Sequence, residues 1–238
     1  MKKRFNVTGT CYPEKHYMAD VSKKWNKTLD MIDYGDYFII NRPRQYGKTT
    51  ALYAMADILG QKEDYLVFNL SFEGVGDLIF TDEKLFPKGF IGLLVSYAKF
   101  GAPELVTWLQ EAALKVQNMQ GLSEFITDFA EKTDKKLVLF IDEVDKSSNN
   151  QLFVNFLAML RNKYLAQKVA KTFHSVVLAG LHDIKTLKLK LRPDDEKKYN
   201  SPWNIAAKFT VDMNLQPSEI KPMLDEYCKD KGVSKGIW

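Results

Sequence analysis

The stretch NRPRQYGKTT, residues 41–50, contains the residue types that bind phosphate groups. It ends in Gly47-Lys48-Thr49, as the pattern G-x-x-x-x-G-K-[ST] requires, but Arg42 stands where that pattern has its first glycine. In such a loop, backbone N–H groups and the N-terminus of a helix bind phosphate. The Lys48 ammonium would bridge β- and γ-phosphate oxygens, and the Thr49 hydroxyl would ligate Mg²⁺. Because Gly-Lys dipeptides are common, the pattern needs support from the rest of the chain.

A second candidate group is the acidic pair Asp142-Glu143, which follows the apolar run LVLFI of residues 137–141. At the end of a strand, Asp142 could hold Mg²⁺ and its waters, and Glu143 could orient or deprotonate an attacking water. The alternative is a polar strand end that leads into a turn with Asp145 and Lys146. Two independent groups in the order that a nucleotide site requires favour nucleotide binding over coincidence.

The elements that must position these residues are short apolar runs that alternate with helical patterns, which indicates parallel β-α-β units and an α/β fold. The predicted strands are residues 37–40, 65–70, 137–141 and 175–179, with 209–211 as a short fifth candidate. The predicted helices are residues 20–34 (N-cap Asp20), 50–59, 88–99, 103–130, 150–166 and 218–229 (N-cap Ser218). Residues 72–88 are predicted to form a loop, and residues 185–199 a surface loop or hairpin. The phosphate-binding pattern therefore lies between a strand and a helix, as such a loop requires.

Composition narrows the class of protein. Of the 238 residues, 45% are hydrophobic and 27% are charged, as in ordinary soluble globular proteins. No run approaches about 18 apolar residues, so we expect no transmembrane helix, and the start lacks the apolar region of a signal peptide. Cys11 and Cys228 lie near opposite ends and indicate no disulfide or metal framework, so a reducing cytoplasm is the simplest interpretation. The net charge of +4 comes from interspersed charges, which favours solubility over nucleic-acid binding.

Several segments carry a resemblance to a known family: VTGTCYPEKHYMAD (7–20), RPRQYGKTT (42–50), LVLFIDEVD (137–145), LAGLHDIK (178–185) and SPWNIA (201–206). With them the sequence resembles the AAA-like P-loop ATPases, in particular bacterial AAA-ATPase-like proteins related to the STAND and archaeal ATPase groups. The resemblance implies a P-loop NTPase fold, a three-layer α/β/α sandwich with a mainly parallel five-stranded sheet and the start of a helical lid at the C-terminus. In such proteins the first glycine of the loop is commonly replaced, so Arg42 does not by itself mark an inactive site.

The resemblance also implies an arrangement of these parts. It puts the Asp-Glu strand next to the loop strand, with Asp142 and Glu143 beside Lys48 and Thr49. The segment from Cys11 to Met18 resembles one that lies against the adenine, although an arm that packs Tyr12, Tyr17 and Met18 onto the core is an equal alternative. The expected division is a leader in residues 1–20, an ATPase core in residues 21–215, and the beginning of a lid in residues 216–238, where truncation is suspected.

The expected site consists of catalytic, metal-binding and nucleotide-binding residues. Lys48 and Glu143 are the catalytic candidates, and Thr49 and Asp142 are the metal ligands. The candidates for nucleotide contacts are Gln45, Tyr46, Gly47, Lys48, Thr49, Thr50, Tyr17 and Met18. Three further assignments stay open: His182 or Asp183 as a γ-phosphate sensor or a capped surface residue, Arg161 as an arginine finger or part of a solvated helix face, and Arg42 and Arg44 as phosphate contacts or surface ion pairs.

The function that these residues predict is Mg²⁺-dependent ATP binding and hydrolysis that drives or gates a conformational change. The alternatives are a non-hydrolysing nucleotide-binding switch or scaffold and the ATPase module of a DNA-directed system, with a kinase as a weaker option. ATP and Mg²⁺ are the expected ligands. A homo-oligomer and a nucleic-acid partner are both open, no membrane partner is expected, and the effector is unknown.

Overall fold

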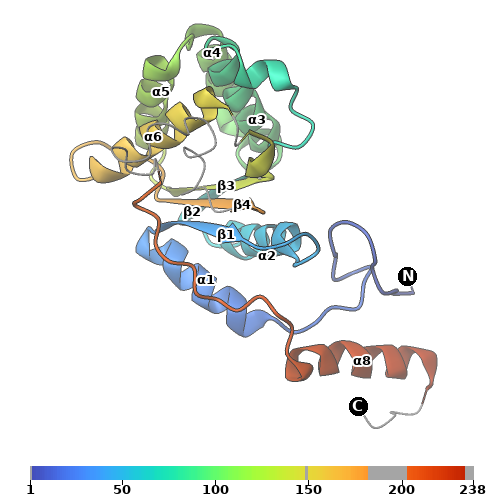
Figure 1. The fold of residues 1–238 in the computed structure, drawn as a ribbon. Helices are drawn as coiled ribbons and strands as arrows, with labels where there is room; N and C mark the ends of the chain where they lie inside the picture. The colour runs from blue at the N-terminus through green and yellow to red at the C-terminus, as the bar shows by residue number, and fades with distance from the viewer. Residues whose placement is uncertain (1, 148–149, 182–202, 234–238) are drawn as a thin grey trace, which may run out of the picture.

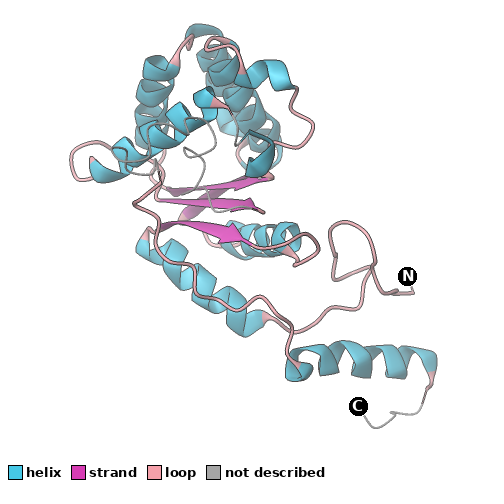
Figure 2. Cartoon of the chain, in the orientation of Figure 1, coloured by secondary structure: helices cyan, strands magenta, loops and turns pink. Residues whose placement is uncertain are grey.

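A four-stranded parallel sheet lies at the centre of the protein (Figures 1 and 2). The computed structural model describes residues 2–147, 150–181 and 203–233. The strands are β1 (Tyr37–Asn41), β2 (Tyr65–Ser71), β3 (Lys136–Asp142) and β4 (Ser175–Gly180), and they pair in the order β1-β4-β3-β2. All of β4 and nearly all of β3 are buried, as strands covered on both faces must be.

Helices cover both faces of this sheet. The α-helices are α1 (Ser22–Tyr34), α2 (Lys48–Gly60), α3 (Leu85–Gly101), α4 (Val106–Lys115), α5 (Met119–Glu131), α6 (Gln151–Leu165) and α8 (Pro217–Lys231). Short 3₁₀ helices occupy Asp77–Phe80, Pro103–Leu105 and Val144–Ser147. Figure 1 shows α1 and α2 on one side of the sheet and α3 to α6 on the other. The α/β class and the three layers are therefore confirmed. None of the described helices is long and apolar enough to cross a membrane.

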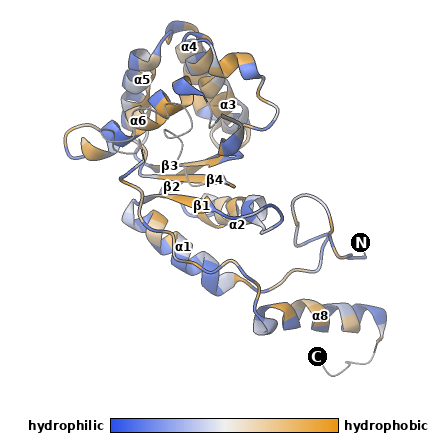
Figure 3. Ribbon diagram, viewed as in Figure 1, coloured by the Kyte–Doolittle hydropathy of each residue, from blue (hydrophilic) through white to orange (hydrophobic). Residues whose placement is uncertain are grey.

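Alternate residues of the strands lie in two separate hydrophobic cores, because successive side chains of a strand point to opposite faces of the sheet. In β1, Phe38 and Ile40 pack with Leu52 and Met55 of α2 on one face. Tyr37 lies in the other core, with residues of α3 to α6. Figure 3 shows the hydrophobic residues concentrated on the strands and on the sides of the helices that meet them. The short apolar runs of the sequence thus correspond to strands that are buried on both faces.

The predicted fifth strand is wrong: residues 209–211 are not a strand. The segment runs beside β1 and pairs with it at one point, where Ala207 N donates to Tyr37 O over 2.8 Å and a parallel bridge joins Ala207 to Phe38. Two residues later the Phe209 ring stacks on the Phe38 ring, with the ring centroids 5.7 Å apart and the planes at 2°. After its single bridge, the segment follows β1 through side-chain packing.

The expected strand order is also wrong. The Asp-Glu strand, β3, does not lie next to the loop strand, β1, because β4 pairs with both of them. Since all strands are parallel, their carboxyl ends still meet at one edge of the sheet. The residues after β1 and β3 therefore approach one another across the end of β4.

Several helix boundaries differ from the predictions. Helix α1 begins at Ser22 with Val21 as its N-cap, and helix α8 begins at Pro217, where Gln216 and Glu219 form a capping box. The predicted helix 103–130 is divided, because Asn118 caps a new helix by accepting a bond from Gly121 N. The loop predicted at 72–88 contains a 3₁₀ helix and the first turn of α3. Residues 185–199 lie outside the described residues.

Candidate functional site

The loop between β1 and α2 has the backbone of an anion-binding nest. Gly47 and Gln45 have φ angles of 73° and 64°, on either side of Tyr46, whose φ is not positive. Such an alternation makes successive N–H groups converge on one point, where an anion binds. Arg42 is not among the described residues with positive φ, so the first position of the pattern does not need a glycine. Gly47 occupies the position where glycine relieves strain.

Lys48 lies inside this loop. Its side chain is buried, with 7% of the residue exposed, and Nζ donates to Arg42 O over 2.9 Å and to Pro43 O over 3.1 Å. A phosphate that entered the nest could exchange these carbonyl partners for its own oxygens. The ammonium therefore lies inside the loop, at the N-terminus of α2.

Thr49 and Asp142 meet directly. Thr49 Oγ1 donates to Asp142 Oδ2 over 2.6 Å, and Asp142 Oδ1 accepts from Glu143 N over 2.9 Å. A hydroxyl and a carboxylate are ligands that Mg²⁺ accepts in proteins. Among the residues that the structure describes, no group of three or more His, Cys, Asp or Glu side chains could hold a metal ion.

Glu143 has an unusual backbone and an unusual environment. Its φ of 55° is left-handed, a strained conformation for a residue with a side chain. Burial is the largest cause that raises the pKa of its carboxyl above the ordinary value, and the nearby carboxylates of Asp142 and Glu73 raise it further, whereas Lys48 lowers it. A strained, partly desolvated carboxylate therefore lies near Lys48.

Two further carboxylates lie near Glu143: Glu73, which was not among the predicted site residues, and Asp145, which was expected only as part of the turn after the strand. Glu73 follows β2, whose last residue, Ser71, is in register with Asp142. The Asp145 carboxylate accepts a hydrogen bond from Leu181 N and so ties the turn after β3 to the end of β4. The signal that could have found Glu73 is its place just after a predicted strand, since the carboxyl ends of parallel strands share one edge.

A cavity of about 570 Å³ adjoins the loop. Its walls come from the leader, α1, the loop, the segment before α8 and α8 itself. It is lined by Phe5, Asn6, Cys11, Tyr17, Met18, Ala19, Val21, Lys24, Trp25, Gln45, Tyr46, Gly47, Met213, Asn214, Leu215 and Met223. Five of the predicted nucleotide contacts, namely Gln45, Tyr46, Gly47, Tyr17 and Met18, thus lie on one cavity. The remaining three, Lys48, Thr49 and Thr50, form the adjoining first turn of α2.

The leader contacts both the first turn of α2 and α8. Cys11 N donates to Thr50 Oγ1 over 3.2 Å. The Tyr17 hydroxyl donates to Asp230 Oδ2 over 3.3 Å, and the Tyr17 ring lies 5.5 Å from the Tyr227 ring, edge to face. The leader is therefore a packed arm, as one alternative held, but its partner is α8. It also lines the cavity, as the other alternative requires.

The arginines have different surroundings. Arg161 Nε donates to Asn204 Oδ1 over 2.5 Å within the chain, and Arg44 is exposed. The Arg42 side chain turns back to Asn41 O and to Val211 O, at 2.9 and 3.2 Å. His182 and Asp183 lie outside the described residues.

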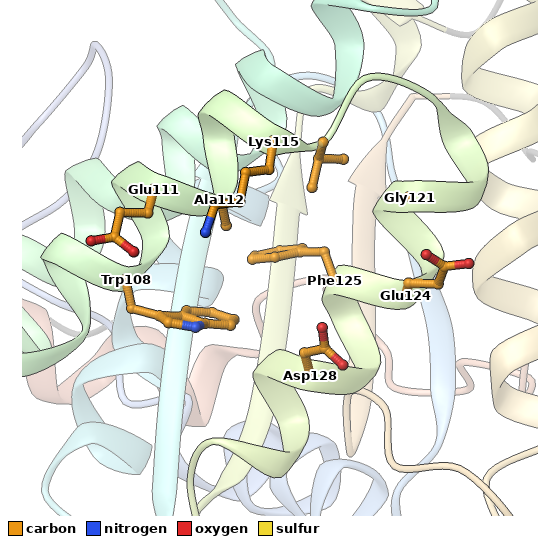
Figure 4. Close-up of a pocket in the computed structure, with 9 residues that line it drawn as sticks. Trp108, Glu111, Ala112, Lys115, Gly121, Glu124, Phe125 and Asp128 are labelled. Carbon is orange, nitrogen blue, oxygen red and sulfur yellow. The ribbon is translucent and has the colours of Figure 1, made fainter.

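A second cavity, of about 310 Å³, lies between α4 and α5 (Figure 4). The stacked rings of Trp108 and Phe125, 5.4 Å apart, form part of its wall. The charged residues around it are three carboxylates, Glu111, Glu124 and Asp128, and one ammonium, Lys115. This excess of negative charge suits a polyphosphate poorly.

Comparisons with known proteins identify the family and the fold. A family model described as an AAA-like domain matches residues 14–223. The Walker-type ATPase of Pyrococcus abyssi has a similar fold, with a TM-score of 0.56 and 11% sequence identity. The match covers 97% of this chain and 63% of the other, so the chain spans less than two thirds of that protein's length. No curated protein matches the chain in sequence. The family model covers the loop as well as the Asp-Glu pair, and the chain therefore belongs to the AAA-like domain family.

Proposed function

We propose that the protein binds ATP with Mg²⁺ and hydrolyses it to ADP and phosphate. The observation that carries the proposal is the 2.6 Å hydrogen bond between Thr49 and Asp142. It joins the loop motif to the acidic pair, although β4 separates β1, which leads into the loop, from β3, which ends in Asp142. Chance motifs would have no reason to meet in this way.

In this proposal the parts of the nucleotide are divided between two neighbouring regions. The nest of Gln45, Tyr46 and Gly47, together with Lys48, receives the phosphates. The cavity beside the loop receives the nucleoside, against Tyr17 and Met18. Residues 21–215 then form the ATPase core, residues 1–20 the leader and residues 216–238 the beginning of a lid. The leader, from Phe5 to Ala19, and Met223 of α8 line the cavity beside the core.

Thr49 and Asp142 would hold the Mg²⁺ ion, which when bound neutralises charge on the β- and γ-phosphates. The Glu143 carboxylate takes a proton from a water, and the water oxygen forms a bond to the γ-phosphorus. The bond between that phosphorus and the β,γ-bridging oxygen breaks, and its electrons stay on ADP. Lys48 stabilises the negative charge that gathers on the phosphate oxygens.

Phosphate release by the wild type, Lys48→Ala and Glu143→Gln, with Mg²⁺ and with excess chelator, tests the proposal. We expect release that requires Mg²⁺, is lost in Lys48→Ala, and falls by about 10²- to 10⁴-fold in Glu143→Gln, the typical contribution of a general base. Lys88→Ala, an exposed substitution on α3, is the matched control. Turnover that is equal in wild type and Lys48→Ala would refute the site. ATP binding without turnover in the wild type would instead favour the non-hydrolysing switch.

A further inference from the structure

Arg42 occupies the loop position at which the common pattern has glycine, and its side chain makes specific contacts. Nη1 donates to Asn41 O over 2.9 Å and Nη2 donates to Val211 O over 3.2 Å. The guanidinium carbon lies 5.8 Å from the centroid of the Phe209 ring, over its face. The side chain therefore contacts a segment that is far away in sequence.

That segment, residues 207–215, we call the C-terminal strap. It begins at the bridge between Ala207 and β1, and its Phe209 ring stacks on Phe38. Its far end, Met213, Asn214 and Leu215, forms part of the wall of the cavity beside the loop. Arg42 thus contacts the middle of a strap whose end shapes that cavity.

Charged side chains also contact the far end of the strap. Lys24 Nζ donates to Asn214 O over 2.6 Å. Hydrogen bonds from the Asn214 N–H group are the main reason that the pKa of the Asp212 carboxyl lies below its ordinary value, and the positive charges of Lys24 and Arg42 lower it further. Lys24 and Arg42 thus each donate a hydrogen bond to a backbone carbonyl of the strap.

The backbone of Arg42 belongs to the phosphate end of the site. Arg42 O accepts a hydrogen bond from Lys48 Nζ, and Arg42 N donates to Gly180 O over 3.1 Å. One residue therefore joins the loop lysine, the end of β4 and the strap. A glycine would keep the backbone contacts and lose every contact to the strap.

We infer that Arg42 is a positioning residue for the nucleoside part of the ligand, acting through the C-terminal strap. This inference rests on the proposed function, since it divides ATP between the loop and the cavity. We therefore expect that Arg42→Gly, which restores the glycine of the common pattern, weakens binding of the nucleotide. The weakening falls on ligands that carry a base, because the strap lines the cavity and the phosphates bind at the loop.

Calorimetric titrations of Arg42→Gly with a non-hydrolysable ATP analogue and with inorganic tripolyphosphate, both with Mg²⁺, test this inference. We expect the affinity for the analogue to fall about tenfold, the effect of losing one charge-assisted hydrogen bond. Affinity for tripolyphosphate is expected to stay within about twofold. In steady-state turnover, KM for ATP is expected to rise by about tenfold with little change in kcat.

Two further variants separate positioning from simple loss of charge or of stability. Arg44→Gly removes the same charge from the same loop without a contact to the strap, so any effect falls equally on both ligands. Phe209→Leu changes the strap instead of Arg42 and removes the ring on which the guanidinium lies. We expect it to weaken binding of the analogue but not of tripolyphosphate, as Arg42→Gly does. Arg42→Lys keeps the charge and one donor, so it is expected to restore part of the affinity.

The outcomes separate the role of Arg42 from the proposed binding of ATP. Equal losses for the analogue and for tripolyphosphate in Arg42→Gly would mean that Arg42 acts on the phosphates, and unchanged affinity for the analogue would remove its role; either overturns the inference. Binding of neither ligand by the wild type would overturn the proposed function itself. If Arg42→Gly fails to fold, Phe209→Leu carries the same test.

Discussion

The substitution Lys48→Met removes an ammonium and keeps the length of the side chain. In the structure Nζ donates two hydrogen bonds to loop carbonyls, and ATP binding would exchange both for bonds to phosphate oxygens. At about 1.5 kcal/mol for each charge-assisted bond, the variant loses about 3 kcal/mol of binding free energy. This corresponds to a dissociation constant about 10²-fold higher.

Thermal unfolding with a non-hydrolysable ATP analogue and Mg²⁺ measures this loss. At a ligand concentration about 100 times the wild-type dissociation constant, binding stabilises the wild type by about 2.7 kcal/mol. For a protein of this size, Tm should rise by about 5–10 °C. In Lys48→Met the same concentration only equals the dissociation constant, so the stabilisation is about 0.4 kcal/mol and Tm rises by about 1 °C.

The comparison contains its own control, because each variant is measured against itself without ligand. The carbonyl of Pro43 belongs to an exposed residue and can bind water when the ammonium is gone, so Tm without ligand should change little. Lys88→Met, at an exposed position of α3, should show the full shift of the wild type. An equal ligand-induced rise in Lys48→Met and wild type would refute the assignment of Lys48 to the phosphates.

Three further predictions concern the same edge of the sheet. A general base must be deprotonated to act, and the pKa of Glu143 is raised above its ordinary value of 4.5, so turnover should increase as the pH rises through this raised pKa. The pH–rate profile of Glu143→Gln should lack this increase. Gly47→Ala places a Cβ at a φ of 73°, which costs about 1–2 kcal/mol, so calorimetry should show analogue binding about 5- to 30-fold weaker, whereas Gln45→Gly should retain it within a few fold. In Gly180→Ala the new Cβ would lie 2.7 Å from Asp145 Oδ2, so urea unfolding should show a loss of about 1–3 kcal/mol; unchanged stability would contradict the close packing of this turn.

Much of the fold was predictable because its strands are short apolar runs with helices between them. The strands β1 to β4 lie where the apolar runs predict them, and the layers follow from burial on both faces. The order of the strands was not predictable from this pattern, since nothing in a run of apolar residues says which neighbour it pairs with. Residues 209–211 show the same limit, because β-forming residue types do not reveal that one bridge and a ring stack replace a ladder.

The centre of the site was predictable and its surroundings were not. The closeness of Thr49 and Asp142 was expected only from the family resemblance, because the strand and the loop that carry them are not neighbours in the sheet. Glu73 and Asp145 depend on which strand ends lie side by side, and that is a property of the assembled sheet. The sequence also gave no signal that the Arg42 side chain reaches Val211, because the two residues are brought together only by the path of the C-terminal strap.

The packing of the leader on α8 has a consequence for how the protein is made. Lys3 Nζ lies 2.7 Å from Glu226 Oε1, and the Phe5 ring lies 5.1 Å from the Tyr227 ring, so the first part of the chain is held by a helix that the ribosome synthesises late. During synthesis, the sheet strands and the loop leave the ribosome well before α8 does. Until α8 emerges, the leader lacks its main partner and the cavity beside the loop lacks one wall. The nascent chain can therefore assemble the loop early, but it completes the cavity only after α8 has emerged.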